Sequence, residues 1–366
     1  MPLAPGSALL VNPPSPRGVS VNREGFGGLG VVTSAGGFVY PAHSLAELQA
    51  ALRRRRFEVE AKDLVLEPRA RYSCEQNLIV VRVAHATLGA DLAFAAQCST
   101  RVPDAKLVVW GVGLEAVRPE VSRALPQALL HTGFDAEALA AAIVGDEVLD
   151  VELRPDADWR GLSLGPTQRL PLWHRRGCTH SCRWCPYVIA TGRRIHGRSP
   201  ARTALEFQRQ VAAHRPKRVV IRDPVFGSDV SDALLLLSRI QHLSSNFRAP
   251  FEIETRPECL SEHLVDALAA AGCVEVKLGI ETFEETALVA GERLLPGMSV
   301  ADYRESVRAA LARLKLRHLP VRVYLMRGLP HSTPRGDDAT MAALGDMEEI
   351  SVHPWRNPEA DPEMSA

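Results

Sequence analysis

Net charge is what this sequence lacks. Lys plus Arg and Asp plus Glu each number 43 among 366 residues, so the formal charge is zero. A neutral chain has no general electrostatic field to attract nucleic acid or an anionic membrane surface. We therefore expect neither of them as a partner.

Long apolar runs and a disulfide framework are also missing. No stretch approaches the ~20 apolar residues of a membrane-spanning helix, and the first residues, MPLAPGSALLVNPP, have no basic segment before their short apolar run. Seven cysteines are a small and odd number, which favours a reducing compartment. We expect a cytoplasmic globular protein. Its length predicts two domains at roughly 150 residues each.

Strand-like and helix-like segments alternate through residues 1–150. Apolar runs occupy residues 8–14, 57–66, 77–84, 106–113 and 128–133. Ser44 stands three residues before Glu47, a spacing that predicts a capping box on a helix. The alternation predicts an α/β domain with a doubly wound parallel sheet. Residues 151–166 have no sustained periodicity and contain Pro and Gly, so they are expected to form a linker.

A second alternating pattern covers residues 167–353. Strand-like runs occur at 168–174, 218–223, 251–256, 274–280, 321–328 and 349–355, and helices are expected to begin near Pro200, Asp229, Ser261, Thr282 and Ser299. Six such units are too few for a closed eight-stranded barrel. The pattern predicts an open six-stranded (β/α)6 partial TIM barrel with its site at the carboxyl ends of the strands. Residues 354–366 are expected to be a disordered tail.

Three cysteines, Cys178, Cys182 and Cys185, form a CxxxCxxC motif directly after the first strand of the second half. Thiolates gathered in one loop bind iron–sulfur clusters or zinc. A four-iron cluster on three cysteines keeps one iron open to a chelating molecule. The alternative is a zinc site with His174 or His180 as the fourth ligand.

The motif has Trp184 just before its third cysteine, and the segments ECLSEHLVDALAAAGCVEVKLGIET and YLMRGLP follow downstream. With these features the sequence resembles the radical S-adenosylmethionine (SAM) superfamily over most of its length. The N-terminal half resembles the cobalamin-binding-type domain that is fused to one branch of that superfamily. The resemblance implies that the three cysteines hold a 4Fe-4S cluster and that SAM chelates the open iron. An electron from a flavodoxin- or ferredoxin-type donor would then cleave SAM to a 5′-deoxyadenosyl radical.

The same resemblance implies SAM contacts for several residues at or near strand ends. They are Trp184, Asp223, Arg256, Gly279, Glu281 and Gly328. The guanidinium fork of Arg256 suits a carboxylate; the alternative is a solvated arginine. Asp223 would accept from the methionine ammonium, although Pro224 departs from the usual family pattern.

The other strand-end residues also have two interpretations each. Glu281 would hydrogen-bond the SAM ribose or cap the next helix. Gly279 and Gly328 would let the backbone approach adenine, or they are ordinary turn glycines.

In the N-terminal half, Val112, Gly113 and Gly133 would lie beside cobalamin, or they form strand-end turns. No DxHxxG motif supplies a lower-ligand histidine; the nearest string, VAHATLG, does not fit. The resemblance implies cobalamin-dependent methylation of an unactivated carbon in a small-molecule, carrier-bound or peptide substrate of a biosynthetic pathway. One alternative is a radical SAM reaction without cobalamin, such as epimerisation, dehydration or deoxygenation. The other is a non-catalytic, zinc-stabilised binding protein.

Overall fold

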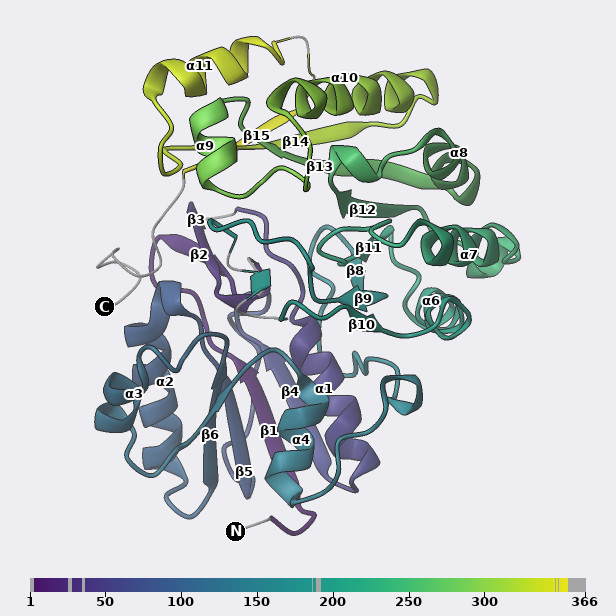
Figure 1. Cartoon of the computed structure of the whole chain (residues 1–366). Helices are drawn as coiled ribbons and strands as arrows, with labels where there is room; N and C mark the ends of the chain where they lie inside the picture. The colour runs from purple at the N-terminus through teal and green to yellow at the C-terminus, as the bar shows by residue number, and fades with distance from the viewer. Residues whose placement is uncertain are drawn as a thin grey trace. The chain divides into compact units, whose positions relative to one another are not determined.

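The chain forms two compact units (Figure 1). The computed structural model describes residues 3–25, 28–34, 37–185, 187–188, 192–345, 347 and 349–354. Of these, the first unit contains the residues up to 169 together with 187–188, and the second contains 170–185 and 192–354. The tail expected at 354–366 lies outside the described residues from 355 onward.

The first unit contains a five-stranded sheet in the order β4-β1-β5-β6-β7, and every adjacent pair is parallel. Its strands are β1 (Ser7–Asn12), β4 (Glu58–Asp63), β5 (Leu78–Arg82), β6 (Lys106–Gly111) and β7 (Leu129–Thr132). Central strands of such a sheet are buried on both faces and need continuous apolar runs. The sequence has these runs, and the predicted doubly wound sheet is confirmed.

Helices cover both faces of this sheet (Figure 1). They are α1 (His43–Arg54), α2 (Leu88–Arg101), α3 (Arg118–Ala124) and α4 (Ala136–Val144). Because side chains alternate along a strand, Leu10 and Trp110 pack with α1 and α4, whereas Leu9 and Val109 pack with α2 and α3.

The predicted capping box at Ser44 is wrong. Helix α1 begins at His43, and Ala42 occupies the N-cap position. The backbone N–H of Ala42 donates to Asp63 Oδ2 at the end of β4 (3.2 Å). A carboxylate that is distant in sequence therefore accepts the hydrogen bond at the start of this helix. The buried Ser44 hydroxyl instead donates to Glu24 Oε1 (2.5 Å).

The glycine-rich stretch contains a hairpin that the sequence did not predict. It consists of β2 (Val19–Asn22) and β3 (Val31–Ser34), and a buried ion pair joins it to the sheet. Arg23 Nε donates to Asp91 Oδ2 (3.0 Å), and both side chains are fully buried. Arg23 Nη1 also donates to Asn12 Oδ1 (3.0 Å) and to the Pro13 carbonyl (2.7 Å). Asp91 accepts the Ala84 N–H as well (3.0 Å). The pair therefore links the hairpin to the carboxyl ends of β1 and β5.

The second unit contains a six-stranded sheet in the order β15-β14-β13-β12-β11-β8, which confirms the predicted open barrel. Adjacent strands from β11 to β15 are parallel. The strands are β8 (Arg169–Leu172), β11 (Arg218–Ile221), β12 (Phe251–Thr255), β13 (Cys273–Glu281), β14 (Val321–Arg327) and β15 (Ile350–Pro354). A short antiparallel pair, β9 (Arg175–Arg176) with β10 (His196–Gly197), follows β8.

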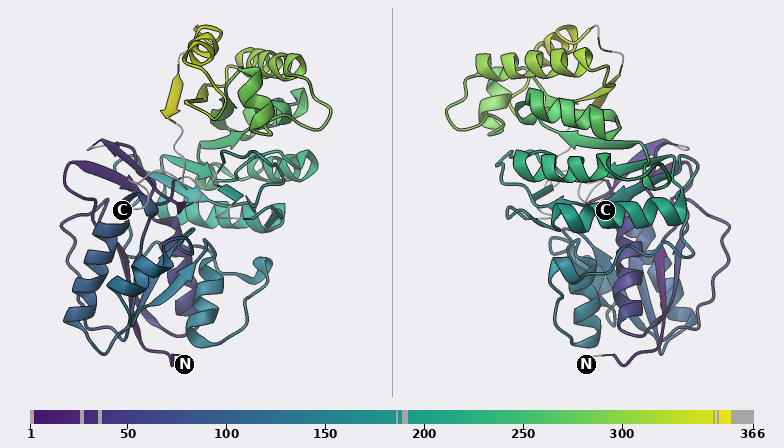
Figure 2. Two further views of the ribbon diagram at one scale, coloured as in Figure 1. Left: turned by 60° about the vertical axis from the view of Figure 1, so that its left-hand side comes forward. Right: turned by 90° about the vertical axis from the view of Figure 1, so that its right-hand side faces the viewer.

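Helices cover one face of this second sheet (Figures 1 and 2). They are α6 (Pro200–His214), α7 (Val230–Gln241), α8 (Glu262–Ala271), α9 (Glu285–Ala290), α10 (Val300–Leu316) and α11 (Pro334–Ala342). Short 3-10 turns lie at η2 (His85–Thr87), η3 (Val151–Leu153), η4 (Ser245–Phe247) and η5 (Pro257–Cys259). None of the helices in the described ranges has both the length and the hydropathy to span a bilayer.

Local capping predicts most of these helix starts. Side chains of Ser199, Asp229, Ser261 and Ser299 accept backbone N–H groups at the starts of α6, α7, α8 and α10. The expected start at Thr282 is wrong, because α9 begins at Glu285. The Thr282 hydroxyl accepts the N–H of Glu284 ahead of the helix (3.0 Å).

The two faces of the second sheet differ in polarity. Ile253 and Leu278 belong to the apolar core beneath the helices. The alternating positions Glu252, Glu275 and Lys277 face the other way, and Lys277 Nζ donates to Glu252 Oε1 (2.5 Å). The inner face of the open barrel is therefore charged.

We expect Asp91→Asn to lower the free energy of unfolding by about 3–5 kcal/mol, because it leaves the buried Arg23 without its counter-charge. Urea denaturation measures the change. Arg118→Met, which breaks the exposed pair with Glu115, is the matched control and should remain close to wild type. Equal changes in the two variants would contradict a special role for the buried pair.

Candidate active site

Residues expected to contact SAM come from successive strand ends of the second sheet. The cysteine loop follows β8, Asp223 follows β11 and Arg256 follows β12. Glu281 ends β13, and Gly328 follows β14. Because carboxyl ends of parallel strands share one edge of a sheet, these groups lie along the same edge.

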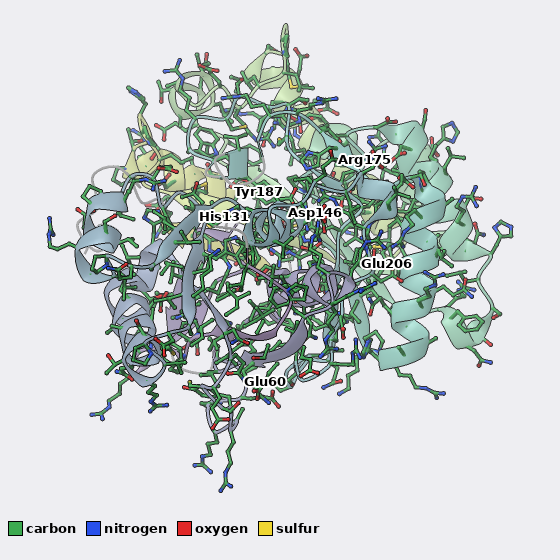
Figure 3. All side chains as sticks on the ribbon, turned by 90° about the horizontal axis from the view of Figure 1, so that it is seen from below. Glu60, His131, Asp146, Arg175, Tyr187 and Glu206 are labelled. Atoms are coloured by element: carbon green, nitrogen blue, oxygen red, sulfur yellow. The ribbon has the colours of Figure 1, made fainter. Side chains whose placement is uncertain are left out.

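Asp223 fixes the start of the cysteine loop. Its buried carboxylate oxygen Oδ1 accepts the backbone N–H groups of His174 and Arg175, each at 2.9 Å. Burial raises the pKa of this carboxyl, and His174 opposes the rise. Arg175, labelled in Figure 3, also pairs with Asp232 on α7. The chain therefore leaves β8 in a defined direction.

His174 is not available as a metal ligand. Its Nδ1 lies 2.9 Å from Thr203 Oγ1, and its Nε2 lies 2.5 Å from Asp232 Oδ2. Both ring nitrogens therefore have partners, and the zinc alternative with His174 is wrong. Burial, followed by the charges of Arg256 and Arg293, lowers the pKa of His180 to about 4, so this imidazole is neutral.

The first cysteine follows a tight glycine position. Gly177 has φ +88°, and a Cβ there would lie 2.1 Å from the Arg194 carbonyl oxygen. Only glycine fits both constraints. The next residue, Cys178, donates its N–H to the Gly192 carbonyl (3.1 Å). Burial raises the pKa of the Cys178 thiol.

Trp184 seats the rest of the loop against α9. It is buried with Ala287 and Leu329, and Cys182 and Cys185 pack against this small cluster. A Cβ on Gly291, just after α9, would lie only 1.6 Å from Trp184 Cζ3. The Arg183 N–H also donates to the Gly291 carbonyl (2.9 Å). The missing side chain at Gly291 thus makes room for the indole.

Arg256 is buried beside the second cysteine, so its alternative as a solvated arginine is wrong. Its Nη1 donates to Cys182 Sγ (3.7 Å). Its Nη2 donates to Glu258 Oε1 (2.9 Å) and to the Arg293 carbonyl (2.6 Å). The guanidinium is held from several directions.

Glu258 and Arg293 complete this network, and neither was singled out from the sequence. Arg293, which is 2% exposed, donates to Glu258 Oε1 and to the Gly279 carbonyl, both at 2.8 Å. Burial raises the pKa of Glu258, but Arg293 and then Arg256 outweigh it and lower this pKa to about 2. Glu258 could have been found from its place beside Arg256 in the segment ETRPE. Arg293 lies 37 residues after Arg256, so no local pattern connects the two.

Glu281 lies at an irregularity between β13 and β14 and has φ +69°. A Cβ on Gly279 would meet its Oε1 at 2.8 Å, so the glycine leaves room for this carboxyl group. Burial raises the pKa of Glu281 to about 7; Arg293 opposes this effect and Glu254 adds to it. No side chain caps α9, and the helix-cap interpretation of Glu281 is wrong.

Gly328 is exposed and has φ +72°, with no atom within 4 Å of a Cβ built there. Its N–H donates to Asp337 Oδ2 on α11 (3.0 Å). This strand end therefore remains open.

The part of the chain that the structure describes contains no group of three His, Cys, Asp or Glu side chains arranged to hold a single metal ion. The donors that the sequence brings to this edge are the three thiols of one loop. Such donors are typical of an iron–sulfur cluster.

The corresponding edge of the first sheet carries the other predicted glycines. Val112 is fully buried, and a Cβ on Gly113 would meet His85 Nε2 and Leu29 Cδ2, both at 3.1 Å. Gly133 has φ +123° and open space on that side. His85 Nε2 is buried and has no hydrogen-bond partner among the described residues. Gly133 is thus open, whereas Gly113 is packed.

Comparisons with known proteins agree with this architecture. The model of the radical SAM superfamily matches residues 174–341. The radical SAM methyltransferase TsrM from Kitasatospora setae, with cobalamin and a 4Fe-4S cluster bound, aligns with a TM-score of 0.69 at 18% identity, over 94% of this chain and 74% of TsrM. TsrM with tryptophan substrate and the SAM analogue aza-SAM gives a TM-score of 0.70 at 18% identity, covering 95% and 72%.

The cobalamin-dependent SAM radical enzyme OxsB gives a TM-score of 0.65 at 14% identity. That alignment covers 94% of this chain and 54% of OxsB. No curated protein matches the sequence. At these identities the structural likeness establishes the two-unit fold.

We expect Gly291→Ala to displace Trp184, because the new methyl group would overlap the indole. Such overpacking costs about 1–3 kcal/mol, and iron retained after reconstitution should fall. Gly345→Ala is the control, since a Cβ there makes only an ordinary contact at 3.4 Å. Wild-type iron content in Gly291→Ala would contradict this role for the glycine.

Glu281 gives a pH-dependent prediction. Its folded-state pKa of about 7 lies above the ordinary 4.5, so the native chain holds a proton that the unfolded chain releases between these values. Stability from this group is present at low pH and is lost as the pH rises through that window. In urea denaturation of the apoprotein, Glu281→Gln should therefore gain stability relative to wild type between pH 5 and pH 8. Glu285→Gln, exposed on α9, controls for the loss of a carboxylate, and a pH-independent difference for Glu281→Gln would contradict the raised pKa.

Proposed function

We propose, from the match of residues 174–341 to the radical SAM superfamily, that the protein is a cobalamin-dependent radical SAM methyltransferase acting on an unactivated carbon. The observation that supports this most is the fold. Both units align with TsrM, which binds cobalamin and a 4Fe-4S cluster, over 94% of this chain. A radical SAM domain alone would not require the first unit.

Cys178, Cys182 and Cys185 would hold the 4Fe-4S cluster. When bound, the cluster supplies the electron that cleaves SAM, and cobalamin supplies the methyl group. The chain's own task is to fix these groups and exclude water. Asp223 holds the start of the loop, and Trp184 holds its end against α9.

Three strand ends offer polar contacts for SAM. Asp223 Oδ1 is engaged by the loop, so its second oxygen is the one proposed for the methionine ammonium. The Glu281 carboxyl, half-protonated near neutral pH, can both donate to and accept from a ribose hydroxyl. Gly328 provides an open strand end for adenine. The Gly279 carbonyl is already bound by Arg293.

The first unit would hold cobalamin at the carboxyl edge of its sheet. The fit rests on the unpartnered, buried His85 Nε2 and on the open backbone at Gly133. The corrin rim carries amide groups, which are suitable partners for such a nitrogen. Gly113 would form part of the wall of this site. A larger side chain at this position would press against His85 and Leu29.

The substrate would bind against the charged inner face of the second sheet. Glu254 on β12 belongs to this face and is exposed, so its carboxyl group is accessible to a bound molecule. A flavodoxin- or ferredoxin-type protein would supply the electron. A small-molecule, carrier-bound or peptide substrate with polar groups is consistent with this lining.

Anaerobic reconstitution with iron, sulfide and hydroxocobalamin tests the proposal. After gel filtration we expect a brown protein that retains corrinoid in about one-to-one ratio. Cys182→Ala should lose the cluster absorbance, whereas Cys74→Ala, a cysteine of the first unit, should keep it. A cluster without retained corrinoid would favour the cobalamin-independent alternative. A colourless protein containing zinc would overturn the enzyme proposal.

A further inference from the structure

We propose that Arg256 and Glu258 set the reduction potential of the iron–sulfur cluster through the Sγ atom of Cys182. The inference rests on the proposed function, since a cluster must be bound. Arg256 would act as a positioning residue on a cluster ligand, beyond the SAM contact expected from the sequence.

The contact that carries this inference is the N–H···S hydrogen bond from Arg256 Nη1 to Cys182 Sγ (3.7 Å). Hydrogen bonds to cluster sulfurs are among the main protein effects on cluster potential. A guanidinium donor adds a full positive charge to the bond. The reduced cluster carries one more negative charge than the oxidised cluster, so this cation favours reduction.

Burial makes the charge effective. Arg256 is 6% exposed and Arg293 is 2% exposed, while the side chain of Glu258 is 5% exposed. Two cations and one anion give the network a net charge of +1. Water screens these charges weakly, so removing any one of them should be felt at the sulfur.

The network also prevents Arg256 from turning away. Its Nη2 is fixed by Glu258 and by the Arg293 carbonyl (2.9 and 2.6 Å). Arg293 is in turn anchored to the Gly279 carbonyl at the end of β13 (2.8 Å). The donor atom Nη1 is therefore held toward the cysteine loop by Glu258 of η5 and by Arg293, which follows α9 and is itself anchored to β13.

The test is a potentiometric titration of the reconstituted full-length protein, followed by electron paramagnetic resonance of the reduced cluster. Arg256→Met removes the donor and its charge, so the midpoint potential should fall by at least the 59 mV that corresponds to a tenfold change in a one-electron equilibrium. Glu258→Gln removes the negative charge and should raise the potential. A purely structural network would not give shifts of opposite sign.

Arg183→Met is the matched control. Arg183 is adjacent to Cys182 in the sequence, but its side chain is 71% exposed and pairs with Glu292. Its removal should leave the potential close to that of wild type, because solvent screens the charge.

The outcomes separate the two proposals. A wild-type protein that binds no cluster contradicts the proposed function itself. If the wild type binds the cluster but both variants keep its potential, or both shift it in the same direction, only the proposed role of Arg256 and Glu258 is overturned. If Arg256→Met retains no cluster, the sign of the Glu258→Gln shift decides; loss of the cluster from both variants assigns the network a structural role and overturns the inference.

Discussion

Holding an irregular loop of three cysteines in one place is the constraint on which the rest of the second unit depends. The loop has little regular structure of its own, so its position comes from strand ends and helix ends elsewhere in the chain. Asp223 accepts its first N–H groups, Trp184 fills the space left by Gly291, and Arg256 contacts Cys182. Asp223, Gly291 and Arg256 follow the ends of β11, α9 and β12. The position of the loop therefore depends on contacts that the folded second unit supplies.

Local patterns were enough to predict most of the fold. Continuous apolar runs predict the strands of the first sheet, since strands buried on both faces allow few polar residues, whereas strands of the second sheet alternate apolar and charged residues. Helix starts at Ser199, Asp229, Ser261 and Ser299 followed from cap chemistry that acts within one turn. The glycine-rich hairpin β2–β3 was missed because its buried ion pair joins Arg23 to a distant aspartate.

The errors have a common physical cause in contacts between distant residues. Ser44 has the right spacing for a capping box, yet Asp63 serves the helix start and Ser44 binds Glu24. The sequence position of His174 suggests a metal ligand, yet its ring nitrogens lie against Thr203 and Asp232. Arg293 lacks a local motif altogether. The CxxxCxxC motif can be identified because its cysteines lie close together in the sequence, whereas the charged residues around them do not.

Under the proposed function SAM is used in two ways, by radical cleavage at the second unit and by methyl transfer to the cobalamin that the first unit would hold. The most direct measurement is to incubate the reduced protein, loaded with cluster and cobalamin, with SAM and to quantify 5′-deoxyadenosine and S-adenosylhomocysteine by mass spectrometry. Both products are expected, with S-adenosylhomocysteine depending on cobalamin. The absence of 5′-deoxyadenosine, or S-adenosylhomocysteine that forms equally well without cobalamin, would contradict these two uses of SAM.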